Sequence, residues 1–279
     1  MKITKTILAM SLAAVMAMGV LSGCSSDQQS LEKIKESGEI VMYTNAEFAP
    51  FEYIGDNNEI VGVDVDIAKE LAKDLGVELK IENVKFDTII GAIQTGKGAF
   101  GAAGITVTPE REEQVDFSVK YVKSKQYIVQ KTDSNFNTID DLKGKQIGVQ
   151  LGTTGDLTID DALMAAADRE DGTDGILYNS GAVLNQYNSA PLAAADIGTG
   201  KLDAVVVDEL PAQAIANREN SGLKAVEMKY SDGSTVEEEY AFCVQKGNTE
   251  LLEAINNTLE RLMAEGKIDE YVLNHTTQE

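Results

Sequence analysis

The sequence predicts an α/β protein whose open sheets carry helices on both faces. Segments with a strand pattern alternate with segments whose apolar residues recur at helical spacing. Glycines such as Gly76 and Gly222 stand where helical patterns end. Strands that alternate with helices form sheets covered by those helices. The 279 residues are enough for one large domain or two small ones.

The first 23 residues have the layout of a secretory signal peptide. Lys2 and Lys5 precede an apolar run, residues 7–21, which is too short and too alanine-rich for a membrane span. Leu21-Ser22-Gly23-Cys24 resembles the bacterial lipoprotein box, which implies that Cys24 is acylated and becomes the N-terminus. The alternative is an ordinary signal peptide with an incidental cysteine. We expect a lipid anchor of the diacylglyceryl type, a tether over residues 24–37, and a mature protein outside the cytoplasm, held at the bacterial cell membrane.

The next segments alternate between strand and helix patterns. Ile67, Leu71 and Leu75 recur at helical spacing, and Asp87 suits the N-cap of a short helix. Thr108 followed by Pro109 is typical of the start of another helix. Strands are expected at residues 39–44, 59–63, 77–82 and 99–105. Helices are expected at residues 64–75 and 87–95, and from Pro109 onward.

A second α/β unit follows an extended stretch at residues 121–131. The apolar run at residues 203–207 predicts a buried strand, and residues 249–264 form an amphipathic helical pattern. The other strands are expected at residues 145–150, 176–179 and 240–244. The other helices are expected after residues 152–155 and at residues 209–220.

The composition excludes several classes of function. The net charge is −22, or about −24 without the signal peptide, so the chain repels nucleic acid and anionic lipid. Cys24 and Cys243 cannot build a disulfide framework, and no cysteine or histidine cluster suggests a metal or another cofactor. The single histidine, His275, lies near the C-terminus, which argues against a histidine-based hydrolase.

Polar residues follow the expected strands where an α/β sheet binds ligands. Ligands bind beyond the carboxyl ends of the strands. Asn45 follows the first strand, and Gly104 and Thr106 lie at the end of the 99–105 strand. Thr154 comes shortly after the 145–150 strand, and Asp208 follows the 203–207 strand. The sequence therefore predicts a ligand site built from these positions.

Arg111 and Asp208 supply opposite charges to this predicted site. Arg111 falls in the first turn of a helix, where the helix dipole disfavours a cation unless an anion rests there. The alternative is a surface arginine paired with Glu110, Glu112 or Glu113. Asp208 could equally be only the N-cap of the next helix. Together the two charges suit the carboxylate and the ammonium group of a zwitterion.

Aromatic residues cluster in the first unit. They are Phe48, Phe51, Tyr53 and Phe86. Most aromatic residues at such spacing belong to a core, but one or two of them could form walls that pack against a ligand.

Ordered motifs along the chain resemble the polar amino-acid family of bacterial extracellular solute-binding proteins, the receptors of ABC importers. The resemblance covers residues 39–272. Its markers are Ala49-Pro50-Phe51-Glu52-Tyr53, Gly62-Val63-Asp64-Val65-Asp66-Ile67-Ala68, Gly104-Ile105-Thr106-Val107-Thr108-Pro109-Glu110-Arg111, Val115-Asp116-Phe117-Ser118, Gly152-Thr153-Thr154, Leu202-Asp203-Ala204-Val205-Val206-Val207-Asp208 and Lys246-Gly247-Asn248.

The resemblance implies a role for each expected site residue. Arg111 would bind the ligand's α-carboxylate, with help from the backbone at Thr106 and Thr154. Gly104, through its carbonyl, and Asp208 would hold the α-ammonium group. The positions that match the side-chain pocket are Asn45, Phe48, Phe86 and Gln150.

The resemblance also implies a two-lobed periplasmic-binding-protein-like fold of type II, with an open mixed sheet in each lobe. Lobe 1 would comprise residues 38–122 and 233–279, and lobe 2 residues 128–230. Residues 123–127 and 231–232 would form the hinge. The chain would be a monomer that closes on an amino acid and delivers it to an ABC permease.

Two other functions share this scaffold. A secreted dehydratase or related lyase, such as a cyclohexadienyl dehydratase, would need an acid in the cleft, for which Glu47 is the best candidate. The other function is that of a sensor that reports its closed state to a membrane kinase. A chain that stops after the lobes favours transport over sensing. The amide side chains of Asn45 and Gln150, beside phenylalanines, suit a neutral polar ligand such as glutamine or cystine. Glu47 keeps a basic amino acid as an alternative ligand.

Overall fold

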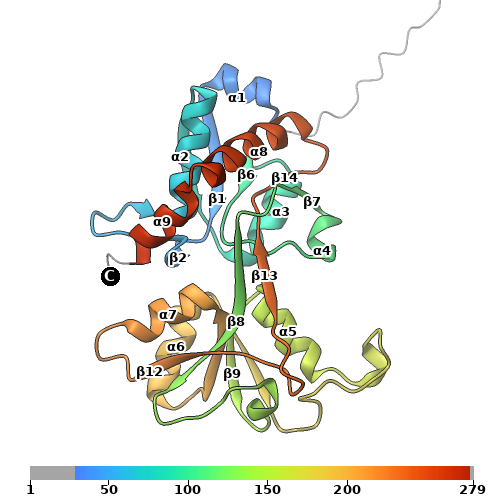
Figure 1. Ribbon diagram of the computed structural model, residues 1–279. Helices are drawn as coiled ribbons and strands as arrows, with labels where there is room; N and C mark the ends of the chain where they lie inside the picture. The colour runs from blue at the N-terminus through green and yellow to red at the C-terminus, as the bar shows by residue number, and fades with distance from the viewer. Residues whose placement is uncertain (1–28, 277–279) are drawn as a thin grey trace, which may run out of the picture.

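A computed structural model describes residues 29–276 and shows two lobes joined by a pair of strands (Figure 1). The expected signal peptide, the lipoprotein box and Cys24 lie outside the described residues. None of the helices within residues 29–276 has the length and apolar character needed to cross a membrane. The predicted α/β fold class, with mixed sheets in two lobes, is confirmed.

The first lobe is built on a five-stranded sheet in the order β5-β1-β6-β14-β7. Strand β1 pairs in parallel with β5 and β6, while β14 pairs antiparallel with β6 and β7. The strands are β1 (Glu39–Thr44), β5 (Glu78–Asn83), β6 (Phe100–Gly101), β7 (Val115–Phe117) and β14 (Cys243–Gln245). The C-terminal part of the chain therefore completes the sheet that the N-terminal part begins.

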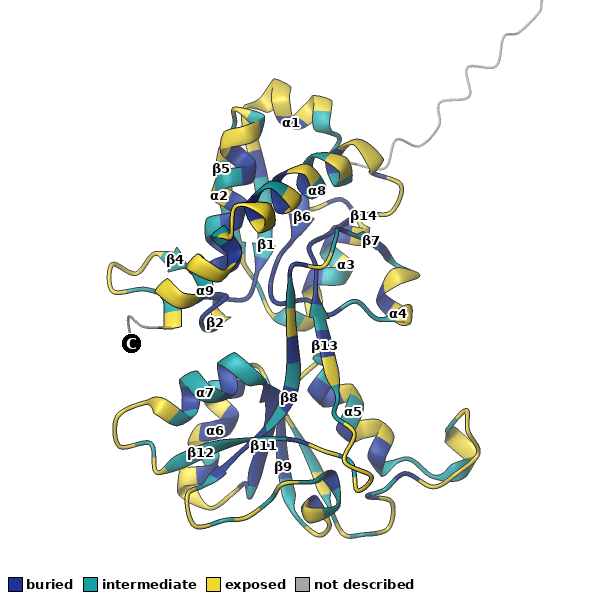
Figure 2. Ribbon diagram, viewed as in Figure 1, coloured by how far each residue is buried: buried dark blue, intermediate teal, exposed yellow. Residues whose placement is uncertain are grey.

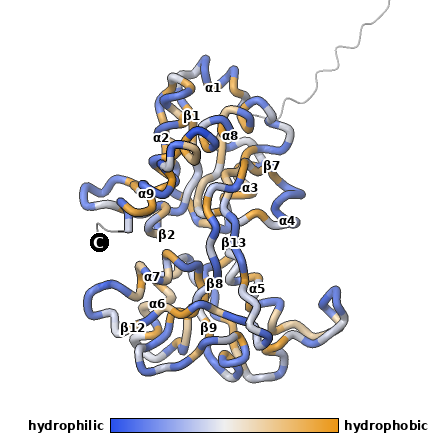
Figure 3. The backbone as a smooth tube through the Cα atoms, in the orientation of Figure 1, coloured by the Kyte–Doolittle hydropathy of each residue, from blue (hydrophilic) through white to orange (hydrophobic). Residues whose placement is uncertain are grey.

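Helices cover both faces of this sheet. Ile67 of α2 and Leu259 of α8 lie in the main core cluster, whereas Ile89 and Ile93 of α3 pack in a separate cluster with Cys243. Buried residues accordingly lie along the strands and on one side of helices such as α2 and α8 (Figure 2), and hydrophobic and hydrophilic residues alternate along these helices (Figure 3). The helices are α1 (Leu31–Ser37), α2 (Val63–Leu75), α3 (Ile89–Gln94), α8 (Thr249–Ala264) and α9 (Lys267–Thr276).

Residues 31–37, expected in the tether, belong to this lobe. They form α1, which Ser30 caps by accepting a hydrogen bond from the backbone N–H of Lys33. Ile34 is fully buried and lies in the core cluster. Its burial makes α1 part of the folded lobe rather than of a tether. In addition, Asn248 donates to the carbonyl of Gln29 at 3.0 Å.

A small three-stranded sheet lies beside the first lobe. Its order is β2-β3-β4, with both pairings antiparallel. The strands are β2 (Glu47–Phe48), β3 (Glu52–Ile54) and β4 (Ile60–Val61). Phe48 at the end of β2 is buried, so this sheet places an aromatic ring at the inner side of the lobe.

The second lobe contains the strand order β10-β9-β11-β8-β12. Strand β9 pairs in parallel with β10 and β11, and β8 pairs antiparallel with β11 and β12. The strands are β8 (Val122–Lys131), β9 (Gln146–Gln150), β10 (Val183–Tyr187), β11 (Ala204–Asp208) and β12 (Leu223–Glu227).

The helices of the second lobe also cover both sheet faces. Val205 and Val207 of β11 share a core cluster with residues of α6 and α7, and Ala204 and Val206 share one with α5. This alternation is what a fully buried strand requires. The helices are α5 (Thr154–Leu163), α6 (Ala190–Thr199) and α7 (Glu209–Asn217). Short 3-10 turns are η1 (Phe86–Thr88), η2 (Ile139–Leu142) and η3 (Ala166–Asp168).

Strands β8 and β13 (Glu237–Tyr240) run side by side between the lobes (Figure 1). They pair antiparallel from Glu237↔Lys125 to Tyr240↔Val122, after which β8 continues into the second sheet. Of the expected hinge residues, 123–127 lie in β8, and 231–232 lie in a turn that precedes β13.

Several expected elements differ from the observed ones. Residues 176–179 form a turn rather than a strand, and the strand of that region is β10. The expected 99–105 strand is reduced to β6, because residues 102–105 form an irregular segment outside the sheet. Asp87 is not an N-cap, since it lies within η1.

Candidate functional site

Arg111 lies in α4 (Pro109–Glu112), a single helical turn. Thr108 caps it, and its hydroxyl oxygen accepts from the backbone N–H of Arg111 at 3.3 Å. Arg111 is 7% exposed; its Nη1 donates to the carbonyl of Thr106 at 2.6 Å and its Nη2 to the carbonyl of Gly152 at 3.0 Å. Since Thr106 and Gly152 belong to different lobes, Arg111 bridges them.

This geometry excludes the alternative of a surface arginine. The side chain is buried, and its hydrogen bonds go to carbonyl oxygens rather than to a neighbouring glutamate. Burial lowers the pKa of the guanidinium, and the negative charge of Glu238 opposes that change. The helix dipole does not distinguish a ligand-binding arginine from a surface arginine here, because Arg111 lies close to both ends of a one-turn helix.

Asp208 ends β11 in the other lobe. It occupies the N-cap position of α7, but its side chain makes no capping bond. Its carboxylate instead accepts from the amide nitrogen of Gln126 and the hydroxyl of Tyr240. Burial, and then the charge of Glu238, raise the pKa of Asp208 to about 7, against the opposing effect of the two hydrogen bonds and Arg111. The simple N-cap alternative is therefore wrong.

Arg111 and Asp208 line one small interlobe cavity of about 20 Å³. Eight of the nine predicted binding residues line it, together with Thr153, Val206 and Val207. The eight are Phe48, Phe86, Gly104, Thr106, Arg111, Gln150, Thr154 and Asp208. Phe86 also lies against Arg111, with 5.6 Å between the guanidinium carbon and the ring centroid.

Asn45, the ninth predicted residue, adjoins the cavity through Gln150. Its side-chain oxygen accepts from Nε2 of Gln150 at 2.9 Å, and its nitrogen donates to the carbonyl of Val84 at 2.8 Å. The Asn45–Gln150 bond joins the lobes a second time. Oε1 of Gln150 has no hydrogen-bond partner among residues 29–276, so this buried acceptor is available.

Gly104 is held in place by a buried carboxyl pair. Its backbone, at φ 54°, donates to Asp64 at 2.9 Å, and the hydroxyl of Tyr121 donates to the same carboxylate at 2.5 Å. Burial raises the pKa of Asp64 to about 6, and burial and the charge of Asp64 hold that of Glu52 well above its usual range. A Cβ at position 104 would come within 2.6 Å of the Phe48 ring, so the close approach requires glycine.

Sequence reasoning missed the residues that surround Asp208. Gln126, Glu238 and Tyr240 come from the two crossing strands and are all buried. Gln126 and Glu238 are polar residues in strands, a pattern that also fits a solvated edge. Only the pairing of β8 with β13 and β11 brings them to the site.

Glu47, the acid required by the enzymatic alternative, lies outside the cavity that holds Arg111. It is exposed and lines a larger interlobe hollow of about 650 Å³. Tyr53 and Asp56 of the first lobe and Arg218 of the second also line this hollow.

Neither His275 nor Cys243 lines the Arg111 cavity. His275 contacts the hydroxyl of Tyr53 at 3.0 Å and the carboxylate of Asp66 at 2.8 Å. Cys243 is a buried free thiol, and burial raises its pKa to about 12. Residues 29–276 contain no histidine, cysteine or carboxylate cluster suited to a metal ion.

Comparisons with known proteins agree with this architecture. Residues 40–277 match the sequence model of the bacterial extracellular solute-binding proteins, family 3, and the chain belongs to this family. It is 28% identical to the L-cystine-binding protein TcyJ of Escherichia coli K12, over 92% of this chain and 91% of the relative. It is 32% identical to ABC transporter arginine-binding protein 1 of the same strain, over 80% and 84%.

A solved structure extends the comparison to an enzyme lineage. The ancestral amino acid-binding protein AncCDT-1, a precursor of cyclohexadienyl dehydratase, superposes with a TM-score of 0.74 at 29% identity, over 88% of this chain and 99% of that chain. The predicted family is thus confirmed, and its relatives include amino-acid-binding proteins of ABC transporters.

Proposed function

We propose that this chain is the substrate-binding protein of an amino-acid ABC importer. Arg111 binds the α-carboxylate of a free amino acid, and Asp208 with the carbonyl of Gly104 binds its α-ammonium group. The observation that carries the proposal is that a buried cation of one lobe and a buried carboxylate of the other line the same cavity. A ligand that contacts both lobes stabilises the closed state, and an ABC permease binds that state.

The rest of the cavity favours a ligand with a polar side chain. The Asn45–Gln150 pair presents amide groups beside Phe48 and Phe86, and Oε1 of Gln150 lacks a partner within the described chain. Cystine, whose binding protein in E. coli is a relative, suits these amides as a neutral polar ligand. Glu47, which lines the neighbouring interlobe hollow, keeps arginine as the second candidate, in line with the arginine-binding relative.

Enzymatic function is the less favoured alternative. The similarity to a dehydratase precursor supports it. A dehydratase needs an acid positioned against the substrate, and Glu47 is exposed outside the Arg111 cavity. Product formation from arogenate or prephenate would favour the enzyme.

The chain is proposed to act as a monomer at the outer face of the membrane, anchored through Cys24. Labelled palmitate should enter the wild-type protein and leave it in the membrane fraction. Cys24→Ser should abolish both labelling and membrane retention; unlabelled wild-type protein would contradict the anchor.

Titration calorimetry tests the binding site. A thermal-shift screen of the twenty amino acids and cystine first identifies the ligand, because binding to the native state raises Tm. Arg111→Ala and Asp208→Asn should each cost about 2–5 kcal/mol of affinity, since each leaves a buried charge without its partner. Arg261→Ala, on the outer face of the first lobe, is the control and should bind normally. Wild-type affinity in both site variants would reject this site.

A further inference from the structure

Two buried carboxylates share one amide group behind the cavity. Nε2 of Gln126 donates to Oδ1 of Asp208 and lies 2.9 Å from Oε1 of Glu238. Glu238 is 2% exposed, and its Oε2 has no hydrogen-bond partner among the described residues. The hydroxyl oxygen of Thr154 is also within 3.2 Å of Nε2. An amide nitrogen has two hydrogens, so it cannot satisfy three acceptors at once.

Few positive charges compensate these carboxylates. Tyr240 of β13 donates to Asp208, and Gln126 of β8 and Thr154 of α5 are neutral. Arg111 of α4 lowers the pKa of Asp208 but donates to carbonyl oxygens, and in residues 29–276 it forms no salt bridge with either carboxylate. Two like charges this close to one amide are costly to bury without a proton or another cation.

We propose that Glu238 is a positioning residue of the ammonium subsite: its charge holds a proton on Asp208, and a ligand's ammonium group takes the place of that proton. This inference rests on the proposed function and adds a step to it. The ammonium group keeps its charge, and the displaced proton passes from the carboxyl group to a base in solvent. No covalent bond of the ligand changes.

The exchange makes ligand affinity depend on pH. Burial and the charge of Glu238 raise the pKa of Asp208 to about 7. Above that pH the carboxylate is ready for the ammonium group. Below it the proton competes with the ligand, and affinity falls by about tenfold per pH unit. Binding of an amino acid near neutral pH therefore releases a fraction of a proton from the protein per ligand bound.

Calorimetry between pH 5.5 and 8.5 tests the exchange. The probe is the amino acid that gives the largest thermal shift among the twenty and cystine. Titration in buffers of different ionisation enthalpy measures the proton released at each pH. The wild type should release close to one proton at pH 6 and almost none at pH 8.5. Uniform affinity with no proton release across this range would overturn the exchange.

Variants of Glu238 test its role. E238Q removes the like charge and should move the midpoint of the affinity profile at least one pH unit lower. E238D keeps the charge and should keep the wild-type midpoint. E239Q is the control, because Glu239 pairs with Lys120 and Lys123 at the surface of the same strand. A wild-type midpoint in E238Q would overturn the positioning role.

The wild-type measurement needs no variant, so it decides the exchange even if E238Q unfolds. In that case E238D alone tests whether the charge at position 238 sets the midpoint. A midpoint for E238D at least one pH unit below that of the wild type would then overturn the positioning role. Failure of every amino acid to bind at any pH would instead reject the proposed function. Tight binding that is insensitive to pH would reject the exchange alone.

Discussion

Asp64 shows how a single buried carboxylate can organise a binding loop. It accepts hydrogen bonds from the backbone of Gly104, beside the cavity, and from Tyr121, which directly precedes the crossing strand β8. Glu52 lies next to it with both oxygens buried. Asp64 thus links the loop that carries Gly104 to the connection between the lobes.

Asp64→Asn should change how stability depends on pH. The pKa of Asp64 is raised to about 6, so the folded wild type holds a proton that the unfolded chain loses near pH 4. This contribution favours folding at low pH and is lost as pH rises through 6. Asparagine does not titrate, so the variant should gain up to about 3 kcal/mol relative to wild type between pH 4 and pH 7. Urea unfolding of both proteins at pH 4 and at pH 7 measures this gain. The same difference in unfolding free energy between variant and wild type at both pH values would contradict the prediction.

Single residues were predicted from the sequence where a strand pattern ended. Asp208 and Gly104 were found because they lie at the ends of apolar runs, and Arg111 because it falls in the first turn of a predicted helix. Gln126 and Glu238 were not, because their burial depends on strands that pair only in the folded chain. Local sequence patterns report exposure poorly for polar residues in strands whose burial depends on pairing with distant segments.

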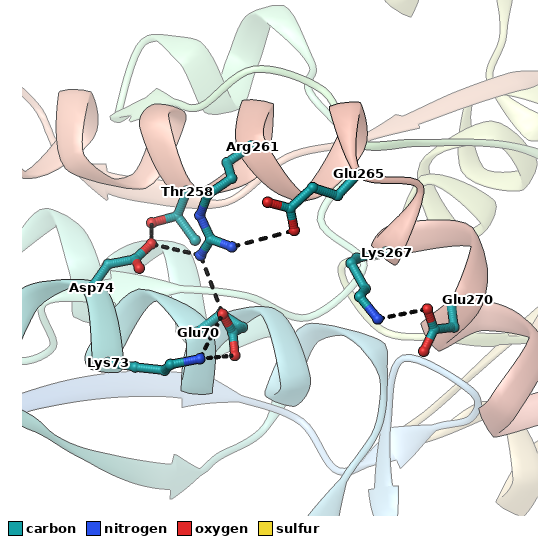
Figure 4. A network of polar contacts seen from close by, with 8 residues as sticks. All are labelled: Glu70, Lys73, Asp74, Thr258, Arg261, Glu265, Lys267 and Glu270. Carbon is teal, nitrogen blue, oxygen red and sulfur yellow. Dashed lines mark hydrogen bonds and ion pairs between the residues drawn. The ribbon is translucent and has the colours of Figure 1, made fainter.

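Helix α8 closes the first lobe with one apolar and one charged face. Leu251, Ile255, Leu259 and Leu262 are buried on its inner face. On the outside, Arg261 bonds Asp74 at 2.8 Å and Glu70 at 3.2 Å on α2, as Figure 4 shows. Exposed ion pairs contribute little, so most of the stabilisation of this helix comes from its apolar face.

Leu259→Ala should lower the unfolding free energy by about 2–5 kcal/mol, because it leaves a cavity in a fully buried position. Met263 lies one turn further along α8 and is 37% exposed, so Met263→Ala should change stability by less than about 0.5 kcal/mol. Chemical denaturation of the two variants gives the comparison. Equal losses of unfolding free energy in the two variants would show that the apolar inner face does not dominate the stabilisation of this helix.

Elements with a strong period were predicted, and weakly patterned ones were missed. The α8 helix at residues 249–264 matches its expected bounds, because its apolar period is clear. Strand β10 was missed because Asn185 and Gln186 interrupt its apolar pattern. Helix α6 was missed because four small residues, Ala190, Ala193, Ala194 and Ala195, give little contrast between its faces.

At the scale of the molecule, the lobes meet closely at Gly152. Its backbone has φ 79°, and a Cβ there would lie 3.1 Å from the Cβ of Asp87 on the opposite lobe. The contact lies beside the Arg111 bond to the Gly152 carbonyl. Closure of the lobes therefore depends on the absence of a side chain at position 152.

Gly152→Ala should weaken ligand affinity about tenfold, because the added methyl group opposes closure at a cost of about 1–3 kcal/mol. Gly181→Ala is the matched control. It has the same backbone strain at φ 81°, but its Cβ would meet only the Cα of Gly144, at 3.8 Å in the same lobe. Both variants should lose stability, but only Gly152→Ala should lose affinity by calorimetry. Equal affinity in the two variants would contradict close contact in the bound state.

The paired connection between the lobes has a mechanical consequence. A lone extended segment would leave every backbone dihedral free, so each lobe could swivel into many orientations. The ladder between β8 and β13 suppresses torsion about either chain and leaves bending as the soft motion. The two halves therefore approach each other in one orientation, and little rotational entropy remains to be lost when they meet.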